Sequence, residues 1–385
     1  MMEVYFDNAA TTKIIPEVKA IMLKTMDEDY GNPSSVHIKG VDAEQYIKYA
    51  RTVISKELKC EPKEITFTSG GTEANNLALI GISDANRRAG NHIITTSIEH
   101  ASVYNPVLAL EEQGFRVSFL PVDNTGIVSI DSLSKELCDE TILVSVMAVN
   151  NEIGAVEPIE EIAAIIKEFN EKNNKKVLFH VDAVQAFGKY RIYPKRIGID
   201  AMSMSGHKVH GPKGSGALFV GGNVKIRPVL YGGGQEKGLR SGTENTTAIA
   251  GMGKAVEVIY SRLDDNIKTM QEVKDALING AVQIEGVTDN SGNAPHISSL
   301  SFEGVRSEVL LHALEEKGIY VSAGSACSSN HPAISGVLKA IGLENRLLDS
   351  TLRFSFNEFN TVEEAEYTVK TLKEIVPMLR RFTRK

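Results

Sequence analysis

Between residues 64 and 220, short apolar runs alternate with longer amphipathic stretches. The short runs are rich in Val, Ile, Phe and Thr, which favours strands, and strands are expected at 64–69, 92–97, 116–122, 141–150, 176–182, 199–205 and 214–220. Over 157–172, apolar residues such as Ile159, Ile162 and Ile166 recur at the spacing of one helical face. Strands that alternate with helices indicate an α/β fold with a mostly parallel sheet covered on both faces.

The pattern changes near residue 260. A long polar helix is expected over 262–281, followed by a strand at 296–304, a helix at 307–318, a strand at 350–357 and a last helix. This mixture is typical of an α+β unit. A chain of 385 residues is also long for a single hydrophobic core. We therefore predict a large domain over 13–260 and a smaller domain formed by 1–12 and 261–385.

Composition and charge indicate a soluble globular protein, with 42% hydrophobic and 24% charged residues. A net charge of −7 gives no overall attraction for nucleic acid, so none is expected as a partner. No apolar run is long enough to span a membrane, and the N-terminus lacks the apolar core of a signal peptide. Cys60, Cys138 and Cys327 are an odd number without paired spacing, which argues against a disulfide framework. We therefore expect a cytoplasmic protein.

Polar residues follow the ends of the predicted parallel strands. The residues that lie at or just past the end of a different strand each are Thr72, His100, Asn151, Asp182 and Lys208. Ligands of such sheets bind beyond the carboxyl ends of the strands, where the loops gather. We therefore expect these five side chains to meet in one site.

Three of these positions have an ordinary structural interpretation beside a functional one. The turn Gly70-Gly71-Thr72 could simply connect a strand to a helix, or its free N–H groups could hold a phosphate. Asp182 could form a structural ion pair, or it could hold a proton on a heterocyclic nitrogen. Lys208, in "SMSGHKVHGP", could be a charged loop residue or a nucleophile.

Taken together, these residue types match the needs of pyridoxal 5'-phosphate. That cofactor requires a lysine for a Schiff base, an acid beside its pyridine nitrogen, a phosphate cradle and a flat side chain against its ring. His100, at the end of "TSIEH", is expected to supply the flat side chain, although a lone His there is also typical of a helix cap. Lys213, in "GPKGSG", is the competing lysine.

A metal site is the rival interpretation, because His180 and Asp182 are two positions apart and His207 and His210 are three apart. Strand alternation places His180 and Asp182 on one face, but His207 and His210 belong to the loop around Lys208. No further carboxylate–histidine spacing supplies a second set of ligands. The sequence therefore predicts no metal.

Stretches in order from residue 5 to residue 357 resemble the cysteine desulfurases of the NifS and IscS type, which are fold-type I pyridoxal phosphate enzymes of the class-V aminotransferase group. They are "YFDNAATT", "GNPSSVH", "FTSGGTEANN", "EHASV", "VNNEIG", "HVDAVQ", "SGHKVHGPKG", "GGGQEKGLRSGTEN", "SAGSACSS" and "LRFSFN". The set is specific because it combines a cofactor lysine with a nucleophilic cysteine. The resemblance implies a large domain with a mostly parallel seven-stranded sheet, a smaller α+β domain that carries the cysteine loop, and a homodimer.

The resemblance also implies roles for individual residues. Lys208 would bind the cofactor as a Schiff base, Asp182 would keep the pyridine nitrogen protonated, and His100 would stack on the ring and move protons. The other expected cofactor contacts are Gly71, Thr72, Gln185, Ser205 and His207, joined by Thr243 reaching across from the second subunit. Asn151 and Arg353 would hold the substrate carboxylate. Arg353 suits this role because a guanidinium can bind a carboxylate through two parallel hydrogen bonds.

Cys327 decides the reaction that the resemblance implies. Its neighbours in "SAGSACSSN" are small and polar, whereas Cys60 and Cys138 lack a chemical neighbourhood. The Cys327 thiolate would attack the sulfur of bound L-cysteine, leaving L-alanine and a persulfide on the enzyme. The sulfur would then pass to an acceptor protein, either an iron–sulfur scaffold or a tRNA-thiolating enzyme.

Other functions on the same scaffold stay open. An aminotransferase would keep Lys208 and Asp182 without needing Cys327, and a selenocysteine lyase would differ in preferring selenocysteine to cysteine. A non-catalytic sulfur carrier would lose the cofactor residues, yet all of them are present. A nucleotide-binding α/β protein is disfavoured, because the acidic residue expected after a glycine-rich fingerprint is missing.

Overall fold

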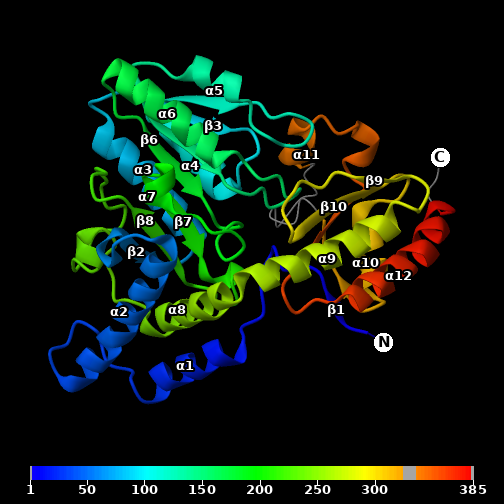
Figure 1. Ribbon diagram of the computed structural model, residues 1–385, viewed down its shortest axis with the longest axis horizontal. Helices are drawn as coiled ribbons and strands as arrows, with labels where there is room; N and C mark the ends of the chain where they lie inside the picture. Colours follow the sequence, from blue (N-terminus) through cyan, green and yellow to red (C-terminus); the bar gives the residue numbers. More distant parts are fainter. Residues whose placement is uncertain (1, 324–334, 383–385) are drawn as a thin grey trace.

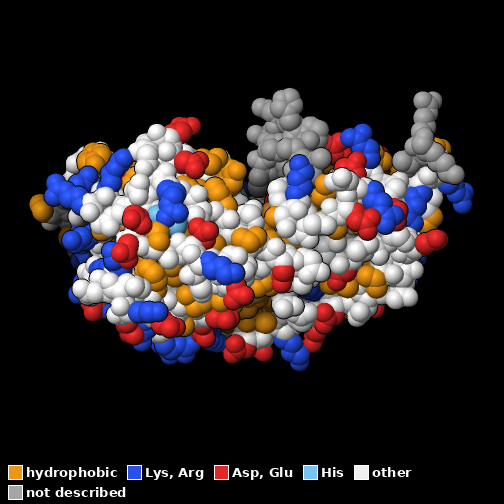
Figure 2. All heavy atoms as spheres, turned by 90° about the horizontal axis from the view of Figure 1, so that it is seen from above, with side chains coloured by type: hydrophobic (Ala, Val, Ile, Leu, Met, Phe, Trp, Pro, Cys, Tyr) orange, Lys and Arg blue, Asp and Glu red, His pale blue; other side chains and the backbone are white. Residues whose placement is uncertain are grey.

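The computed structural model describes residues 2–323 and 335–382, so Cys327 lies outside the described residues. Figure 1 shows two groups of elements joined by the helices α8 (Thr246–Ser261) and α9 (Leu263–Ala281), which follow each other almost end to end. One group is built on a seven-stranded sheet and the other on a four-stranded sheet. On the face shown in Figure 2, acidic and basic side chains are interspersed over both groups. No helix within the described ranges is long and apolar enough to cross a membrane.

The seven-stranded sheet is mostly parallel, as predicted. Its strands are β2 (Ile65–Thr68), β3 (His92–Thr96), β4 (Arg116–Leu120), β5 (Thr141–Met147), β6 (Leu178–Asp182), β7 (Ala201–Ser205) and β8 (Gly216–Val220). Their order across the sheet is β2-β8-β7-β6-β5-β3-β4. β8 pairs antiparallel with both β7 and β2, whereas the pairs from β7 through to β4 are parallel. The carboxyl ends of the other six strands therefore meet at one edge of the sheet.

Helices cover both faces of this sheet, because successive residues of a strand point to opposite sides. Ile93 packs in one apolar cluster with residues of α3 (Gly71–Asn86) and α4 (Ala101–Glu112). Ile94 packs in another cluster, with residues of α2 (Ile38–Leu58), α6 (Ile159–Asn173) and α8. The remaining elements of this group are α1 (Pro16–Asp27), α5 (Ile130–Glu136), α7 (Pro194–Ile197) and the 3-10 turns η1 (Pro62–Glu64), η2 (Gly206–Lys208) and η3 (Glu236–Gly238).

The second group is an α+β unit. Its antiparallel sheet has the order β12-β13-β10-β9 and consists of β9 (Val287–Asp289), β10 (Ile297–Phe302), β12 (Ser322–Ala323) and β13 (Thr351–Ser355). Residues of α9, α10 (Ser307–Glu315) and α12 (Val362–Arg380) pack against this sheet in one apolar cluster. β1 (Val4–Tyr5) pairs with β11 (Ile319–Tyr320), and Val4 enters the same cluster, so the N-terminal strand belongs to this unit. α11 (Gly336–Ala340) packs its Val337 and Leu338 in a separate apolar cluster with Ile98 and Met147 of the first group, and η4 (Asn345–Leu347) follows it in the chain.

The predicted α/β fold with a mostly parallel, helix-covered sheet is confirmed. The sequence pattern does not predict α8, and the reason is its packing between α1 and α2. Its residues are buried without a break from Ala248 to Gly253, and a polar face appears only in the second half, with Lys254, Glu257 and Ser261, so the helical period is marked over a short stretch only. The division into domains at 13–260 and at 1–12 with 261–385 stays a prediction; the helical break at Arg262 lies beside its boundary.

Candidate active site

A cavity of about 430 Å³ lies at the carboxyl ends of the parallel strands. The five strand-end residues all line it: Thr72, His100, Asn151, Asp182 and Lys208. Five further predicted residues line it as well: Gly71, Gln185, Ser205, His207 and Arg353. Thr243 is exposed and is not among the described residues that line the cavity of its own chain. Cys327 lies outside the described residues.

Lys208 lies in η2, the turn that follows β7. Its Nζ donates to the carbonyl oxygens of Ala9 and Ala10, at 2.6 and 2.7 Å. Its own carbonyl oxygen accepts a hydrogen bond from Nζ of Lys189, and burial lowers the pKa of Lys189 to about 8. The competing Lys213 is exposed and does not line the cavity, so Lys208 is the lysine of this site.

Asp182 ends β6 and is buried. Its Oδ2 accepts a hydrogen bond from Nδ2 of Asn75 at 2.7 Å, and its Oδ1 accepts one from the backbone N–H of Val184 at 2.9 Å. Two uncharged donors therefore hold the carboxylate in the cavity lining. Nearby, Nε2 of Gln185 donates to the carbonyl oxygen of Ala9 at 3.0 Å, which ties this edge of the cavity to the N-terminal segment.

His100 is the N-cap residue of α4. Its Nδ1 accepts a hydrogen bond from the backbone N–H of Ser102 at 3.1 Å and lies 2.8 Å from the hydroxyl oxygen of Ser102. Burial lowers the pKa of His100, while the nearby Asp182 acts in the opposite direction and Lys208 in the same one. Nδ1 of His100 thus caps the helix while the same residue lines the cavity, so the two interpretations of His100 are compatible.

The N-terminus of α3 lies at the cavity lining. The first N–H groups of a helix have no intrahelical partners, and here Gly71 and Thr72 supply them at the cavity lining. A Cβ atom on Gly71 would lie 2.7 Å from Cγ2 of Val184, so glycine keeps this approach open. The buried hydroxyl of Ser205 has no hydrogen-bond partner among the described residues, which leaves a donor for a bound anion. Burial, helped by neighbouring lysines, lowers the pKa of His207 to about 4.

Arg353 reaches the cavity from β13 of the second unit. Its guanidinium donates to Oδ1 of Asp7 at 2.8 Å and to the backbone carbonyl oxygen of Asn151 at 2.9 Å. Its buried Nε has no partner within the described part of the chain, so a donor is left for an anionic ligand. The predicted pair of Asn151 and Arg353 is therefore in contact, with the backbone of Asn151 orienting the guanidinium.

Sequence reasoning did not single out four residues that contact predicted site residues: Asp7, Asn75, Ser102 and Lys189. Asp7 lies within "YFDNAATT", a stretch quoted for the resemblance but given no role. The sequence does carry a signal for Asn75. It is a polar residue on the buried, otherwise apolar side of α3, among Ala74, Leu77 and Ala78.

The histidine–aspartate spacing that suggested a metal has another explanation. Both ring nitrogens of His180 are engaged by serine hydroxyls, Nδ1 by Ser145 at 2.8 Å and Nε2 by Ser203 at 3.0 Å. Burial lowers the pKa of His180 to about 3. Within residues 2–323 and 335–382, no three His, Cys, Asp or Glu side chains form a group that could hold a metal ion.

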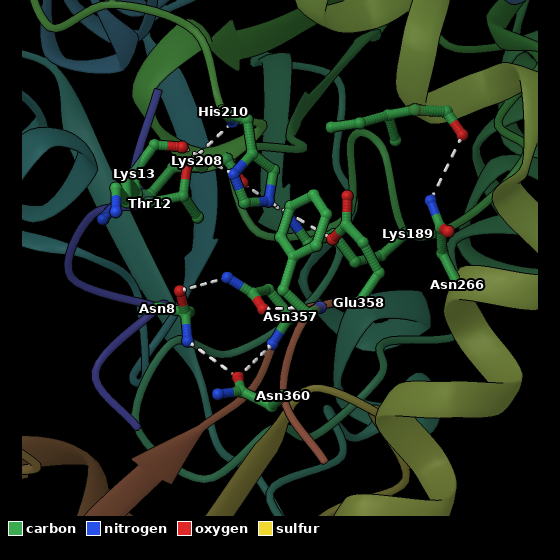
Figure 3. Close-up of polar contacts among 12 residues, drawn as sticks. Asn8, Thr12, Lys13, Lys189, Lys208, His210, Asn266, Asn357, Glu358 and Asn360 are labelled. Atoms are coloured by element: carbon green, nitrogen blue, oxygen red, sulfur yellow. Dashed lines mark hydrogen bonds and ion pairs between the residues drawn. The ribbon is translucent and has the colours of Figure 1, made fainter. Parts of the chain in front are cut away.

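A buried network of polar side chains surrounds the turn of Lys208, as Figure 3 shows. Asn8 donates to Asn360 at 3.1 Å and accepts from Asn357 at 2.7 Å, which joins the N-terminal segment to the loop after β13. On the other side of this network, the backbone N–H of His210 donates to the hydroxyl of Thr12 at 2.7 Å. The N-terminal segment is therefore held between the two groups of elements that form the cavity.

Comparison with known proteins places this site in a family. The family described as aminotransferase class-V matches residues 4–368. The chain is 43% identical over 384 residues to "Cysteine desulfurase IscS" of Clostridium botulinum strain Hall, covering 98% of this chain and 95% of that protein. A solved structure named "NIFS-LIKE PROTEIN" superposes with a TM-score of 0.92 at 37% identity, covering 98% of this chain and 100% of the other.

A second solved structure, "SspA in complex with cysteine", superposes with a TM-score of 0.81 at 34% identity, covering 94% of this chain and 100% of the other. These similarities extend over both groups of elements and over every part of the cavity that the structure describes. The chain therefore belongs to the class-V aminotransferase family and, within it, to the cysteine desulfurases of the IscS and NifS type.

Proposed function

We propose that the protein is a pyridoxal phosphate-dependent cysteine desulfurase that converts L-cysteine to L-alanine and keeps the sulfur as a persulfide on Cys327. The observation that carries the proposal is the convergence of Lys208, Asp182 and Arg353 in one cavity. An amine, a carboxylate and a guanidinium suit the aldehyde and ring nitrogen of the cofactor and the carboxylate of an amino acid. One similar structure is named as a complex with cysteine, which supports that substrate.

The chemistry of the cavity residues fits this cofactor. Gly71 and Thr72 at the start of α3, with the unpartnered hydroxyl of Ser205, offer donors to a phosphate group. Asp182 offers an acceptor to a protonated ring nitrogen, and Lys208 offers an amine. When bound, pyridoxal phosphate supplies an electron sink that acidifies the Cα–H bond of an amino acid and weakens its Cβ–S bond.

Each of the surrounding side chains has a separate task in this proposal. Lys208 would hold the cofactor through Nζ and would take up the Cα proton of the substrate on the same atom. Asp182, held by Asn75 and Val184, would keep a proton on the ring nitrogen. Arg353, oriented by Asp7 and Asn151, binds the substrate carboxylate and so fixes the substrate relative to Lys208. His100 would supply a flat side chain against the ring, and Gln185, which also lines the cavity, would contact the cofactor.

The sulfur transfer requires Cys327 as a thiolate. An S–S bond forms between Cys327 and the substrate sulfur while the Cβ–S bond breaks; the electron pair of the broken bond stays on Cβ, which then takes up a proton. The net reaction turns L-cysteine and the Cys327 thiol into L-alanine and a Cys327 persulfide, so no external oxidant is needed. Cys327 follows the cavity-lining residue Ala323 by four positions, and a fully extended chain of that length spans at most about 14 Å.

We further propose a homodimer in which Thr243 of each subunit completes the phosphate site of the other. Thr243 is exposed on its own chain, and Tyr231, earlier in the same loop region, is 80% exposed, which leaves apolar surface for such a contact. The division into a large domain and a small domain with the cysteine loop belongs to the same proposal. A reducing, cytoplasmic compartment is supported by the free thiols of Cys60 and Cys138. The proposed sulfur acceptor is an iron–sulfur scaffold or a tRNA-thiolating enzyme.

The decisive measurement is the formation of alanine and sulfide from L-cysteine in the presence of dithiothreitol. We expect the wild type to produce both in equal amounts and Cys327→Ala to produce neither. Cys138→Ala is the matched control, because it removes a thiol that lies outside the cavity lining, and it should behave as the wild type.

Other outcomes would replace the proposal. If Cys327→Ala remains active, Cys327 is not the sulfur acceptor. Formation of an oxo acid without sulfide would identify an aminotransferase. A protein that turns over selenocysteine and leaves cysteine untouched would be a selenocysteine lyase.

A further inference from the structure

A chain of hydrogen bonds connects Asp182 to His100 through Asn75 and Ser102, two residues that lie in the stretches quoted for the resemblance but were given no role there. Asn75 on α3 is completely buried, and its Nδ2 donates to Oδ2 of Asp182 at 2.7 Å and to Oγ of Ser102 at 2.8 Å. The Ser102 oxygen in turn lies 2.8 Å from Nδ1 of His100, and the backbone N–H of Ser102 meets the same nitrogen at 3.1 Å.

The chemistry of donors and acceptors sets the direction of each bond in this chain. A carboxylate oxygen accepts, so the amide nitrogen of Asn75, and not its oxygen, must face Asp182. Both N–H bonds of that nitrogen are then in use, and the oxygen of Ser102 accepts one of them. The hydroxyl hydrogen of Ser102 is therefore left to donate, and Nδ1 of His100 is its acceptor.

Nδ1 of His100 thus accepts two hydrogen bonds and carries no proton. In a neutral imidazole the proton must then lie on Nε2. Double protonation would place a new N–H group against the hydroxyl and the backbone N–H of Ser102, which are both donors. Burial already lowers the pKa of His100; of the charged groups that face it, Asp182 opposes this shift and Lys208 adds to it.

We propose that Asn75 and Ser102 are positioning residues that hold His100 as the neutral tautomer with its proton on Nε2, so that the ring acts on the ligand as a hydrogen-bond donor and not as a base. This deepens the proposed function and rests on it, since His100 lines the proposed cofactor cavity. A neutral imidazole that donates from Nε2 can stabilise negative charge as it develops on a substrate atom. It also narrows the role expected from the sequence, in which His100 moves protons.

The test is histidine ¹⁵N NMR of the full-length protein, with and without pyridoxal phosphate. His100 is identified as the resonance lost in His100→Gln. The wild type should show an unprotonated Nδ1 and a protonated Nε2 throughout the neutral pH range. In Ser102→Ala, Nδ1 loses its hydroxyl donor, so we expect a mixture of tautomers and a rise in the pKa of His100 of about 0.5–1 unit. Ser102→Thr keeps the hydroxyl and should restore the wild-type spectrum.

Asn75→Ala frees the Ser102 hydroxyl to turn away, so it should produce a smaller change in the same direction. Asn76→Ala is the matched control, because Asn76 lies on the same helix and donates to the carbonyl oxygen of Thr72 at 2.8 Å. In the loaded enzyme, the acid limb of the kcat/KM profile of Ser102→Ala should move with the pKa of His100 measured by NMR. If Ser102 had a merely structural role, the acid limb of the kcat/KM profile would not follow the pKa of His100.

The proposal is overturned by a proton on Nδ1 or a doubly protonated His100 in the wild type at neutral pH, or by an unchanged tautomer and pKa in both Ser102→Ala and Asn75→Ala. The wild-type spectrum decides the tautomer by itself, so a variant that fails to fold does not leave the question open. The tautomer is also independent of turnover. A protein with the expected spectrum that forms no alanine from L-cysteine would defeat the proposed function and not the hydrogen-bond chain.

Discussion

Nε2 of His210 lies 3.2 Å from a carboxylate oxygen of Glu358 and connects the turn of Lys208 with the loop that follows β13 (Figure 3). Nδ1 of the same ring lies 2.7 Å from the carbonyl oxygen of Lys13. Both ring nitrogens of His210 therefore face oxygen atoms. With side-chain exposures of 2% and 17%, the contact between His210 and Glu358 is largely buried and joins the two groups of elements that form the cavity.

Replacing Glu358 by Gln should weaken this connection. Burial is the largest influence on the pKa of Glu358 and acts to raise it. The hydrogen bond and charge of His210, a backbone hydrogen bond and the charge of Lys189 together outweigh burial, so the pKa is lowered. A lowered carboxyl pKa stabilises the fold above the ordinary value of 4.5, and this stabilisation disappears as the pH falls through the folded-state value. We expect Glu358→Gln to lower the free energy of unfolding by about 1–3 kcal/mol at neutral pH, and by less in acid.

Urea unfolding at a series of pH values measures this difference. Glu366→Gln, at an exposed position of α12, is the control and should match the wild type. A loss of stability that stays constant from neutral to acid pH would mean that the contact between His210 and Glu358 is not charged.

Replacing Lys208 by Ala and replacing Lys213 by Ala should have clearly different effects on cofactor binding and turnover. Lys208 lines the cavity, whereas Lys213 is exposed to solvent. We expect Lys208→Ala to lose the visible absorbance of the lysine-bound cofactor and to slow turnover more than about a hundredfold, because it lacks both the anchor and the proton acceptor. Lys213→Ala should keep both properties. Borohydride reduction and peptide mapping of the wild type should place the cofactor on the peptide that contains Lys208, and a label on Lys213 would refute the assignment.

Arg353→Lys should raise the KM for L-cysteine more than it lowers kcat. The guanidinium of Arg353 donates hydrogen bonds to Asp7 and Asn151, and its Nε is still available for the substrate. A lysine would have a single nitrogen to contact Asp7, Asn151 and the substrate. We expect an increase in KM of about 10–100-fold, the range of a charge-assisted hydrogen bond. Steady-state kinetics test this, with Arg346→Lys on the surface as the control. An unchanged KM with a reduced kcat would show that Arg353 does not bind the substrate carboxylate.

Glu157 should make the protein less stable as the pH rises toward neutrality. Burial raises the pKa of Glu157 from 4.5 to about 7, against the hydrogen bond from the backbone N–H of Val128. The folded state therefore binds more protons than the unfolded state between these two values, and stability falls across that window. Glu157→Gln carries no such proton, so its stability relative to the wild type should improve by roughly 2–4 kcal/mol from pH 4.5 to pH 7.

Chemical unfolding of Glu157→Gln and of the wild type across this pH range tests the prediction. Glu161→Gln is the natural control, because Glu161 is exposed on α6. Parallel stability curves for Glu157→Gln and the wild type would show that the buried carboxyl does not titrate in this window.

The strand ends of the site could be predicted because two local properties place them. The apolar runs locate each strand, and chain order locates the residue that follows it. Asp182 and Lys208 illustrate this, since β6 and β7 are parallel neighbours and their carboxyl ends lie at the same edge. The same reasoning is weaker for α8, because residues 248–253 are buried without a break and only Lys254, Glu257 and Ser261 mark a polar face.

What the sequence by itself determined was therefore the α/β architecture and the set of chemical groups at the strand ends, because both follow from periodicity along the chain. Only the tertiary structure decided which of these groups have partners. Asp7 and Arg353 are 346 positions apart and Asn75 and Asp182 are 107 apart, so no local pattern relates them. A side-chain hydrogen bond depends on how separate elements pack to within a few tenths of an ångström, and that fit is a property of the whole core and not of any one stretch.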